Sequence, residues 1–368
     1  MHRGCAVVPC DHGLNGPGPR ERTGPPYLRP MHRTLIVLAA WMPILLFGQA
    51  PTKQEVKVRR QLDKGKAYAA IRNATAMVLK GTHPEFLALR AEGYNAIGEF
   101  SKAEADARSA MQLLPGRREG LLQLALAEQG LGRLDSAAHH LRQVLGTGAD
   151  AEVRYRLALV EMSRGQLGAA MTEIDRALAM AGAPGPQTAR LHRVKGEVAA
   201  MAGDSLLARQ QLDSAVALAP DDPVNYNSRG YYAHAWRGEH GKAIADYSRA
   251  IRLNPNYSYA FNNRGWSRYK LGEKDKALKD IGQAKRRKAS NPFIYRNLGV
   301  IALESGDTAK ACMLFRQALD WGFTASHGPE VEQRIAACCG KLPVPVQPPA
   351  NNARRPETPV VPRSNAPE

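Results

Sequence analysis

A spacing of 34 residues between small side chains constrains the fold of this chain more than any other feature. Gly265 and Gly299 are 34 residues apart, and each is followed by a glycine seven residues later and an alanine twelve residues later. The length of 368 residues would otherwise suggest two or three globular domains. A fixed period of this size instead indicates one continuous stack of short helix pairs.

The small residues of this unit have physical roles that fit two packed helices. Gly265 on the first helix and Ala277 on the second let the two backbones approach closely. Gly272 is placed to end the first helix, where a left-handed residue satisfies the free carbonyl groups. Ile281 fills the space between the helices, and Ala284 leaves room for the next unit.

The same spacing recurs along most of the chain. Successive anchor residues are separated by 34, 33, 38, 34, 35 and 34 residues, and they are Ala91, Ala125, Ala158, Gly196, Gly230, Gly265 and Gly299. The spacing of 38 predicts a bulge near residues 182–186, and the spacing of 35 reflects one extra residue before Gly238. We expect a degenerate first unit whose polar first helix covers residues 54–63, and a last helix over residues 329–339 that covers the open edge.

This pattern resembles the tetratricopeptide repeat (TPR) family, whose unit is a helix-turn-helix of this period. The resemblance implies an all-α solenoid of about seven to eight repeats plus a C-terminal capping helix, within residues 51–340. It also implies a non-catalytic protein that binds other proteins and needs no cofactor. We find no sequence motif of a serine hydrolase, zinc protease, P-loop or dinucleotide-binding enzyme. The adjacent His139 and His140 point about 100° apart on a helix, so no metal site is expected.

The N-terminal residues have the pattern of an export signal. Residues 1–30 are a doubtful extension without periodicity, and Met31 restarts the sequence with a basic residue, an apolar run and small residues before a cut after Ala50. The pattern predicts a signal peptide over residues 31–50 and a periplasmic or secreted protein that does not span the membrane after cleavage. An uncleaved or interfacial anchor is the alternative.

The positions that would face a ligand lie three residues before, one after and four after each anchor of the first helices. In the resembling family this face is concave. Asparagine side chains can bond both edges of an extended backbone, and aromatic side chains give stiff contact area. From residue 224 to 323 there are fifteen aromatic residues, against five from 51 to 223, which favours the last repeats. The candidate peptide groove is Asn227, Tyr231, His234, Tyr259, Asn262, Asn263, Trp266, Tyr269, Lys270, Phe293, Arg296 and Asn297. Ordinary repeat packing or self-association is the alternative use of these residues.

The charge of the chain limits its partners. Formal net charge is +17, and without residues 1–50 there are 46 basic against 32 acidic residues. An acidic peptide or an anionic polymer would suit this surface, although general solubility is an equally good explanation. The basic run of residues 285–288 also fits the end of a helix, where cations are favourable. Nucleic acid is not expected for an exported protein.

Two further features are left open by the sequence. Cys312, Cys338 and Cys339 can supply one disulfide in an oxidising compartment, or remain buried thiols. Residues 341–368 are rich in proline and predict an extended, disordered tail, which can serve as a ligand, a spacer or a solvated end.

These observations favour a scaffold or assembly factor of the cell envelope that binds a protein or peptide on the face of its C-terminal repeats. The alternative is an accessory or regulatory subunit of an envelope enzyme, or a binder of an anionic polymer through its basic surface. Homo-oligomers are compatible with either. The identity of the partner cannot be inferred from a fold-level resemblance.

Overall fold

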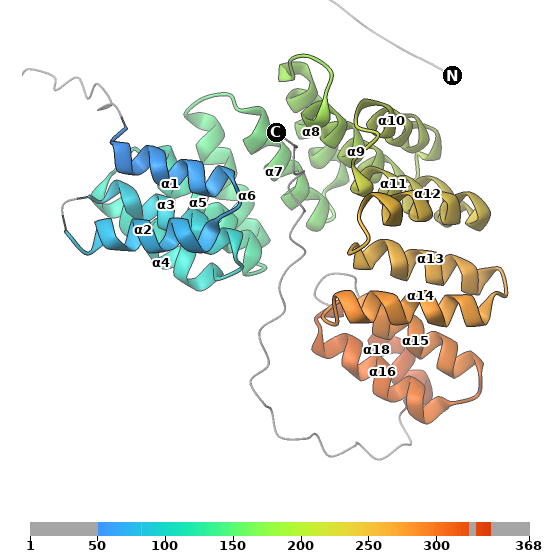
Figure 1. The fold of residues 1–368 in the computed structure, drawn as a ribbon. Coiled ribbons are helices and arrows are strands. Elements are labelled where there is room, and N and C mark those ends of the chain that lie inside the picture. The colour runs from blue at the N-terminus through green and yellow to red at the C-terminus, as the bar shows by residue number, and fades with distance from the viewer. Residues whose placement is uncertain (1–50, 82, 324–328, 340–368) are drawn as a thin grey trace, which may run out of the picture. The chain divides into compact units, whose positions relative to one another are not determined.

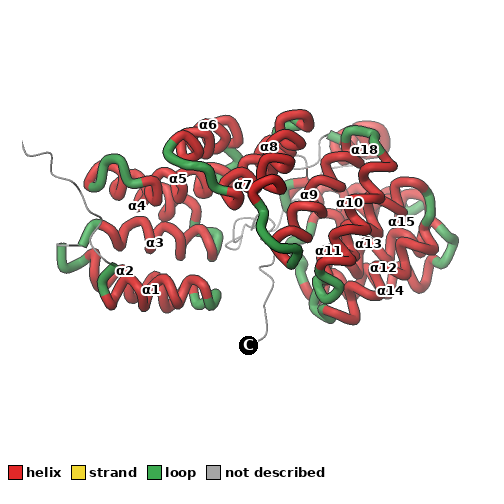
Figure 2. The backbone as a smooth tube through the Cα atoms, turned by 90° about the horizontal axis from the view of Figure 1, so that it is seen from above, coloured by secondary structure: helices red, strands yellow, loops and turns green. Residues whose placement is uncertain are grey.

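The structure is a computed structural model that describes residues 51–81, 83–323 and 329–339. Within these residues the chain forms eight helix pairs and one final helix (Figures 1 and 2). The first helices of the pairs are α1 (Lys53–Asp63), α3 (Glu85–Ala96), α5 (Arg118–Gly130), α7 (Ala151–Ser163), α9 (Pro186–Met201), α11 (Pro223–Ser228) with its continuation, α13 (Ser258–Lys270) and α15 (Pro292–Glu304). The second helices are α2 (Ala67–Val78), α4 (Phe100–Leu113), α6 (Leu134–Gly146), α8 (Leu167–Met180), α10 (Ser205–Leu218), α12 (His240–Leu253), α14 (Lys274–Arg287) and α16 (Thr308–Asp320). The final helix is α18 (Glu330–Cys339).

Close packing of the two helices of a unit depends on the small residues that define the period. A Cβ atom added to Gly265 would lie 2.8 Å from Ile281 Cγ1 and 3.0 Å from the carbonyl oxygen of Ala277. The first distance is shorter than real Cβ contacts and the second is tight, so a side chain at this position would require Ile281 to shift. Ile281 and Ala284 are fully buried and belong to one core cluster with Ile294 of the next unit. The predicted roles of these residues within and between units are confirmed.

The ends of the helices also follow the sequence. Gly272 has a φ of 78° after the C-cap of α13, in the left-handed region that glycine favours. Asn291 caps α15, because its side chain accepts a hydrogen bond from the backbone N–H of Phe293, and Pro292 follows in the first turn. Asp222 and Pro223 do the same for α11.

The two irregular spacings have different structural solutions. The extra residues near 182–186 form the connection between α8 and α9, and α9 is lengthened to 16 residues. The single extra residue before Gly238 is absorbed inside a helix, because α11 continues as the π-helix η1 (Arg229–His234) and the 3₁₀ helix η2 (Ala235–Arg237). A π-helical turn accommodates one more residue without breaking the helix, and such turns are frequent at functional sites.

A repeated polar pair inside the units was not anticipated from the sequence. In three units the arginine before the anchor binds a buried aspartate of the second helix with two hydrogen bonds. The pairs are Arg90–Asp106, Arg229–Asp246 and Arg264–Asp280, with donor–acceptor distances from 2.6 to 2.9 Å. Such planar, bidentate pairs fix the angle between the two helices of a unit.

The C-terminal edge of the stack is covered as the sequence predicted. Val331 of α18 is fully buried in the same cluster as Phe315 and Ile294. A disulfide joins Cys312 of α16 to Cys339 of α18, with a Cα–Cα distance of 5.7 Å, and Cys338 is a free thiol. Helix α18 is therefore held to the last repeat by packing and by a covalent bond.

The expectations about residues 1–50 and 341–368 fall outside the described residues. Among the helices that the structure describes, none combines the length and the apolar character that crossing a membrane requires.

Candidate binding surface on the first helices

A chain of hydrogen bonds connects the first helices of the last three repeats and α18. Asn227 accepts from Asn263 at 3.1 Å, and Asn262 donates to Asn263 at 3.4 Å and accepts from Asn297 at 3.2 Å. Arg296 then donates to Asn297 at 3.0 Å and to Glu330 of α18. Because the linked residues occupy equivalent or adjacent places in successive units, the first helices lie side by side in register. We call the surface that they form the first-helix face.

This chain changes the role of several predicted groove residues. Asn262 is 1 % exposed and Asn297 is 4 % exposed, so their side chains are enclosed between neighbouring helices. Their amide groups bind each other, although their positions in the sequence predicted contacts with the backbone of an extended peptide. Asn227 and Asn263 are half-buried members of the same chain.

The polar contacts continue toward the N-terminal repeats through a buried ion pair. Glu197 accepts hydrogen bonds from Ser228 and from Arg193, both at 2.7 Å, and Arg193 also reaches the hydroxyl of Tyr155 at 3.5 Å. Arg193 and Glu197 are less than a tenth exposed. Buried charges need partners of this kind, because an unpaired charge in the interior is costly.

Trp266 is the centre of an aromatic and cationic patch on the first-helix face. Its ring stacks on Tyr269 at 5.7 Å, with Lys270 at 5.0 Å and Arg296 at 4.8 Å from the ring centre. Tyr269 donates a hydrogen bond to the Glu304 carboxylate, which raises the pKa of the tyrosine to about 12. Trp266 and Tyr269 are half-buried and Lys270 is exposed, so the structure brings these three predicted residues together on one open patch.

The remaining predicted residues lie near this patch or beneath it. Lys288 lies 5.9 Å from the ring centre of the half-buried Tyr259. Phe293 packs edge-on against Phe323 at 5.5 Å and belongs to the rim of the core. Phe293 therefore contributes to the packing of the last unit.

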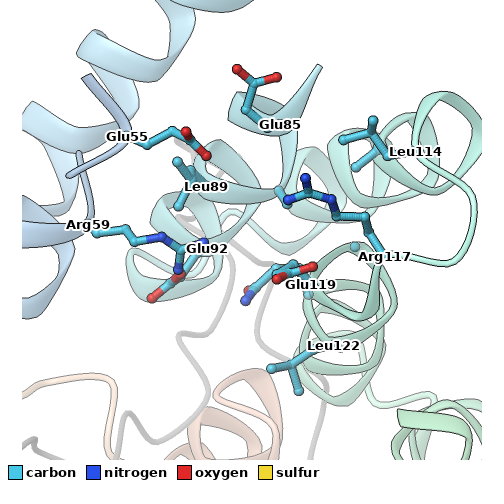
Figure 3. Close-up of a pocket in the computed structure, with 13 residues that line it drawn as sticks. Glu55, Arg59, Glu85, Leu89, Glu92, Leu114, Arg117, Glu119 and Leu122 are labelled. Carbon is cyan, nitrogen blue, oxygen red and sulfur yellow. The ribbon is translucent and has the colours of Figure 1, made fainter. Parts of the chain in front are cut away.

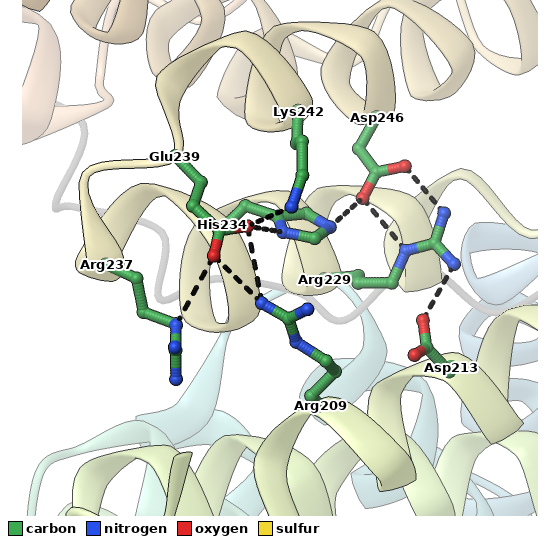
Figure 4. Close-up of polar contacts among 8 residues, drawn as sticks. All are labelled: Arg209, Asp213, Arg229, His234, Arg237, Glu239, Lys242 and Asp246. Atoms are coloured by element: carbon green, nitrogen blue, oxygen red, sulfur yellow. Dashed lines mark hydrogen bonds and ion pairs between the residues drawn. The ribbon is translucent and has the colours of Figure 1, made fainter. Parts of the chain in front are cut away.

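His234 is drawn into a charged network around the π-helix (Figure 4). Its Nδ1 atom lies 3.2 Å from Glu239, and its Nε2 atom lies 3.6 Å from Asp246. Glu239 also binds Lys242 at 2.9 Å and Arg209 at 3.0 Å. The hydrogen bond from Lys242 and those from His234 and Arg209 lower the pKa of the Glu239 carboxyl to about 2. His234 thus faces carboxylates of its own unit, and its imidazole helps to hold the turn.

The π-helix also builds an aromatic cluster that the sequence analysis did not identify. Tyr231, Tyr232 and Trp236 pack edge to face, with ring centres 4.9, 5.7 and 5.1 Å apart. Of these, only Tyr231 was predicted as a groove residue, although Trp236 is 52 % exposed. The spacing of 35 residues between Gly230 and Gly265 could have identified Trp236. If the extra residue lies between Gly230 and Trp236, then Trp236 takes the place that Lys270 has in the next unit.

A small pocket lies on the first helices at the other end of the repeats (Figure 3). It has a volume of about 120 Å³ and an apolar floor that includes Leu89 and Leu122. Charged side chains surround the floor: Glu55, Arg59, Glu85, Glu92, Arg117 and Glu119. Sites for small ligands usually measure about 300–1,000 Å³. This pocket is therefore smaller than such sites.

Comparison with known proteins identifies the repeats. A model of the TPR repeat matches residues 232–272, and a tetratricopeptide repeat model matches residues 122–185, 172–223 and 263–325. Together these matches cover more than half of the 368 residues. Proteins of this family generally act as scaffolds for protein interactions.

Relatives and solved structures agree on the fold. The tetratricopeptide repeat-containing protein trd-1 of Caenorhabditis elegans is 26 % identical over 135 residues, which are 36 % of this chain but only 17 % of trd-1. The structure of the APC/C hetero-tetramer Cut9–Hcn1 has a TM-score of 0.55 at 15 % identity, covering 76 % of this chain and 55 % of that chain. A tetratricopeptide repeat protein from Parabacteroides merdae ATCC 43184 has a TM-score of 0.56 at 16 % identity, covering 68 % of this chain and 97 % of that chain. With the family matches, the 34-residue period and the paired helices, these findings show that the chain belongs to the tetratricopeptide repeat family.

Proposed function

We propose that this protein is a non-catalytic scaffold of the cell envelope, and that it binds an extended, acidic segment of a partner protein on the first-helix face of its last repeats. The observation that carries the proposal is the patch of Trp266, Tyr269 and Lys270. It combines tryptophan and tyrosine, two residue types in which binding hot spots are enriched, with an exposed ammonium group.

The chemistry of the patch favours an acidic partner. Lys270 and Arg296 both lie against the Trp266 ring, and because Lys270 is exposed its ammonium group can also meet a carboxylate of a partner. Arg296 already pairs with Glu330, so a carboxylate is the group that this surface is built to hold. Charge complementarity of this kind mainly sets the association rate and the choice of partner.

Two features support placement in the envelope. The pattern of residues 31–50 is that of an export signal. The Cys312–Cys339 disulfide persists in oxidising compartments and is reduced in the cytosol of most cells. Fractionation of cells that express the full chain tests the location, because a protein found only in the cytosol would contradict the proposal.

The binding site is tested by crosslinking capture with three forms of the protein from the envelope fraction of the source organism. The site variant is Trp266→Ala with Lys270→Ala. The matched control is Lys285→Ala with Arg286→Ala, which removes two exposed charges from the end of α14. We expect a partner to be captured by the wild type and the control, and lost at least about tenfold from the site variant, since a lost hot spot costs more than 1.4 kcal/mol.

The same experiment separates the alternative function. An accessory protein that binds an anionic polymer through its general basic surface would keep its ligand in the site variant. Such a protein would release the polymer when the salt concentration is raised, because salt screens exposed charges. Capture that survives in the site variant therefore rejects the first-helix patch as the binding site, whatever its salt dependence.

A further inference from the structure

The aromatic cluster on the π-helix presents an exposed surface that the patch around Trp266 does not use. Tyr232 packs against the buried Ala199, Ala200 and Ala208 of the preceding unit. Its ring supports Trp236, whose centre lies 5.1 Å away, and Tyr231 supports Trp236 from a second side at 5.7 Å. Trp236 is therefore a fixed ring that remains 52 % exposed.

The preceding unit also exposes apolar side chains. Met201 occupies the equivalent place in the preceding unit and is 40 % exposed, and Leu206, at the start of the following helix, is 68 % exposed. An exposed tryptophan packed against two tyrosines is a surface of the kind that proline-rich segments recognise. Such segments are already extended, and they dock between aromatic rings at little cost in conformational entropy.

We propose that this cluster binds the chain's own C-terminal tail through Pro348 and Pro349, at the end of the segment 342–349. That segment holds four prolines, at positions 343, 345, 348 and 349, and no charged residue. It lacks the carboxylates expected of a ligand for Lys270, but it matches an apolar aromatic surface. The inference concerns a different set of side chains, so it does not depend on the proposed function.

The last residue that the structure describes before this segment lies at the same edge of the repeats as Trp236. The first helices run parallel and in register, as the contacts of Asn227 with Asn263 and of Arg296 with Glu330 show. Trp236 lies at the C-terminal end of the first helix of its unit, and Cys339 is the C-terminal residue of α18. Cys339, the last described residue, therefore lies at the same edge of the stack as Trp236.

The length of the segment also suits the distance. Three steps between neighbouring first helices separate α18 from the π-helix, and at about 10 Å per step they span roughly 30 Å. Residues 340–349 reach about 31 Å when extended as polyproline II, at about 3.1 Å per residue. Pro348 and Pro349 can thus arrive at Trp236 while Cys339 stays in its disulfide.

Protection of the tail from trypsin tests the proposal on the full chain. Trypsin cuts after Lys341 and after Arg354, on either side of the proposed contact. We expect Trp236→Ala to speed both cleavages about tenfold, which corresponds to a contact of about 1.4 kcal/mol. Tyr68→Ala is the matched control, since it removes another exposed aromatic residue, 77 % exposed, from α2. Equal cleavage rates in the wild type and Trp236→Ala overturn the proposal.

A second experiment changes only residues of the tail and leaves the sequence of the folded repeats unchanged. The full chain with P343S, P345S, P348S and P349S has a disabled tail, so its cluster is open to a labelled peptide of residues 341–352. We expect fluorescence anisotropy to show about tenfold tighter peptide binding than to the wild type, whose cluster is occupied in cis. Adding Trp236→Ala should abolish this binding. A peptide that binds wild type and tail variant equally overturns the proposal.

Dilution distinguishes the chain's own tail from that of a second copy. Protection within one molecule is independent of protein concentration, so the trypsin result should be unchanged over a hundredfold dilution. Protection that disappears on dilution assigns the segment to a second copy and rejects the proposal as stated.

Discussion

At the scale of single residues, the buried carboxylates of the second helices hold the units together. Asp280 is 3 % exposed and binds three guanidinium nitrogen atoms, two from Arg264 and one from Arg268, at 2.7–2.8 Å. Both arginines belong to the first helix of the same unit. The aspartate therefore links two turns of α13 to α14, and its removal leaves two cations without their partner.

We predict that Asp280→Ala lowers the free energy of unfolding by about 3 kcal/mol, the usual cost of breaking a buried ion pair by removing one partner. Urea unfolding followed by circular dichroism measures this. Asp275→Ala on the same helix is the control, because Asp275 is exposed. If Asp280→Ala lowers the free energy of unfolding no more than Asp275→Ala does, the ion pairs of Asp280 contribute nothing to stability.

At this scale the sequence predicted the small residues well and the polar ones poorly. The roles of Gly265, Ala277 and Ala284 could be assigned from the sequence, because a small side chain in a stack of helices has one use: it lets neighbouring helices pack closely. Asn262 and Asn297 were predicted to bind a peptide, yet they bind each other. An amide can pair with a ligand or with its neighbour equally well, and only the lateral spacing of the first helices decides between them.

At the scale of elements, the π-helix is the one place where the described first helices depart from α-helical geometry by a whole residue. The turn that follows is held by Glu239, the N-cap residue of α12, through its contacts with His234, Lys242 and Arg209. The extra residue was visible in the spacing of 35. Its location inside a helix was not, because a loop of one more residue gives the same spacing.

The charges around Glu239 predict a pH dependence. The pKa of this carboxyl is lowered to about 2 in the folded chain, against about 4.3 for an unperturbed glutamate. Its contribution to stability is therefore fully present above about pH 4.3 and is lost as the pH falls through about 2. We expect the wild type to exceed Glu239→Gln in urea midpoint at pH 5, and this difference to vanish near pH 2.

The control for that prediction is Glu99→Gln. Glu99 is the N-cap residue of α4 and occupies the same place in its own unit, with Lys102 as its ion-pair partner at 3.3 Å. The Glu239 variant should show the larger change between pH 5 and pH 2. The same change in both variants would assign the effect to the N-cap position and not to the partners His234, Lys242 and Arg209 of Glu239.

At the scale of the whole chain, the repeats are a one-dimensional stack in which consecutive helices pack on each other. Stability in such a stack is close to a sum over neighbouring units, so a local change stays local. This architecture could be predicted from the period alone, together with the polar first helix and the final capping helix. The choice of Cys339 over Cys338 as the partner of Cys312 could not, because both lie at the same end of one helix.

We predict that Cys339→Ser destabilises the C-terminal repeat by about 3 kcal/mol, the typical contribution of a disulfide that closes a loop of this size. Amide hydrogen exchange should become about a hundredfold faster in α15, α16 and α18, and stay unchanged in α3 to α6. Cys338→Ser removes the free thiol but keeps the disulfide, so it should leave exchange unaltered. Acceleration spread evenly over all repeats would contradict the picture of independent neighbours.

The π-helix also has a meaning for the history of the sequence. A single codon gained between Gly230 and Gly238, in the continuation of α11, would ordinarily rotate every later residue of the helix by about 100° and misplace it against its neighbours. The wider turn of η1 confines that rotation to six residues, so the segments on both sides keep their partners. Descendants of the same ancestor that lack the codon should therefore have a spacing of 34 here, a regular α-helix, and no outward tryptophan held by two tyrosines.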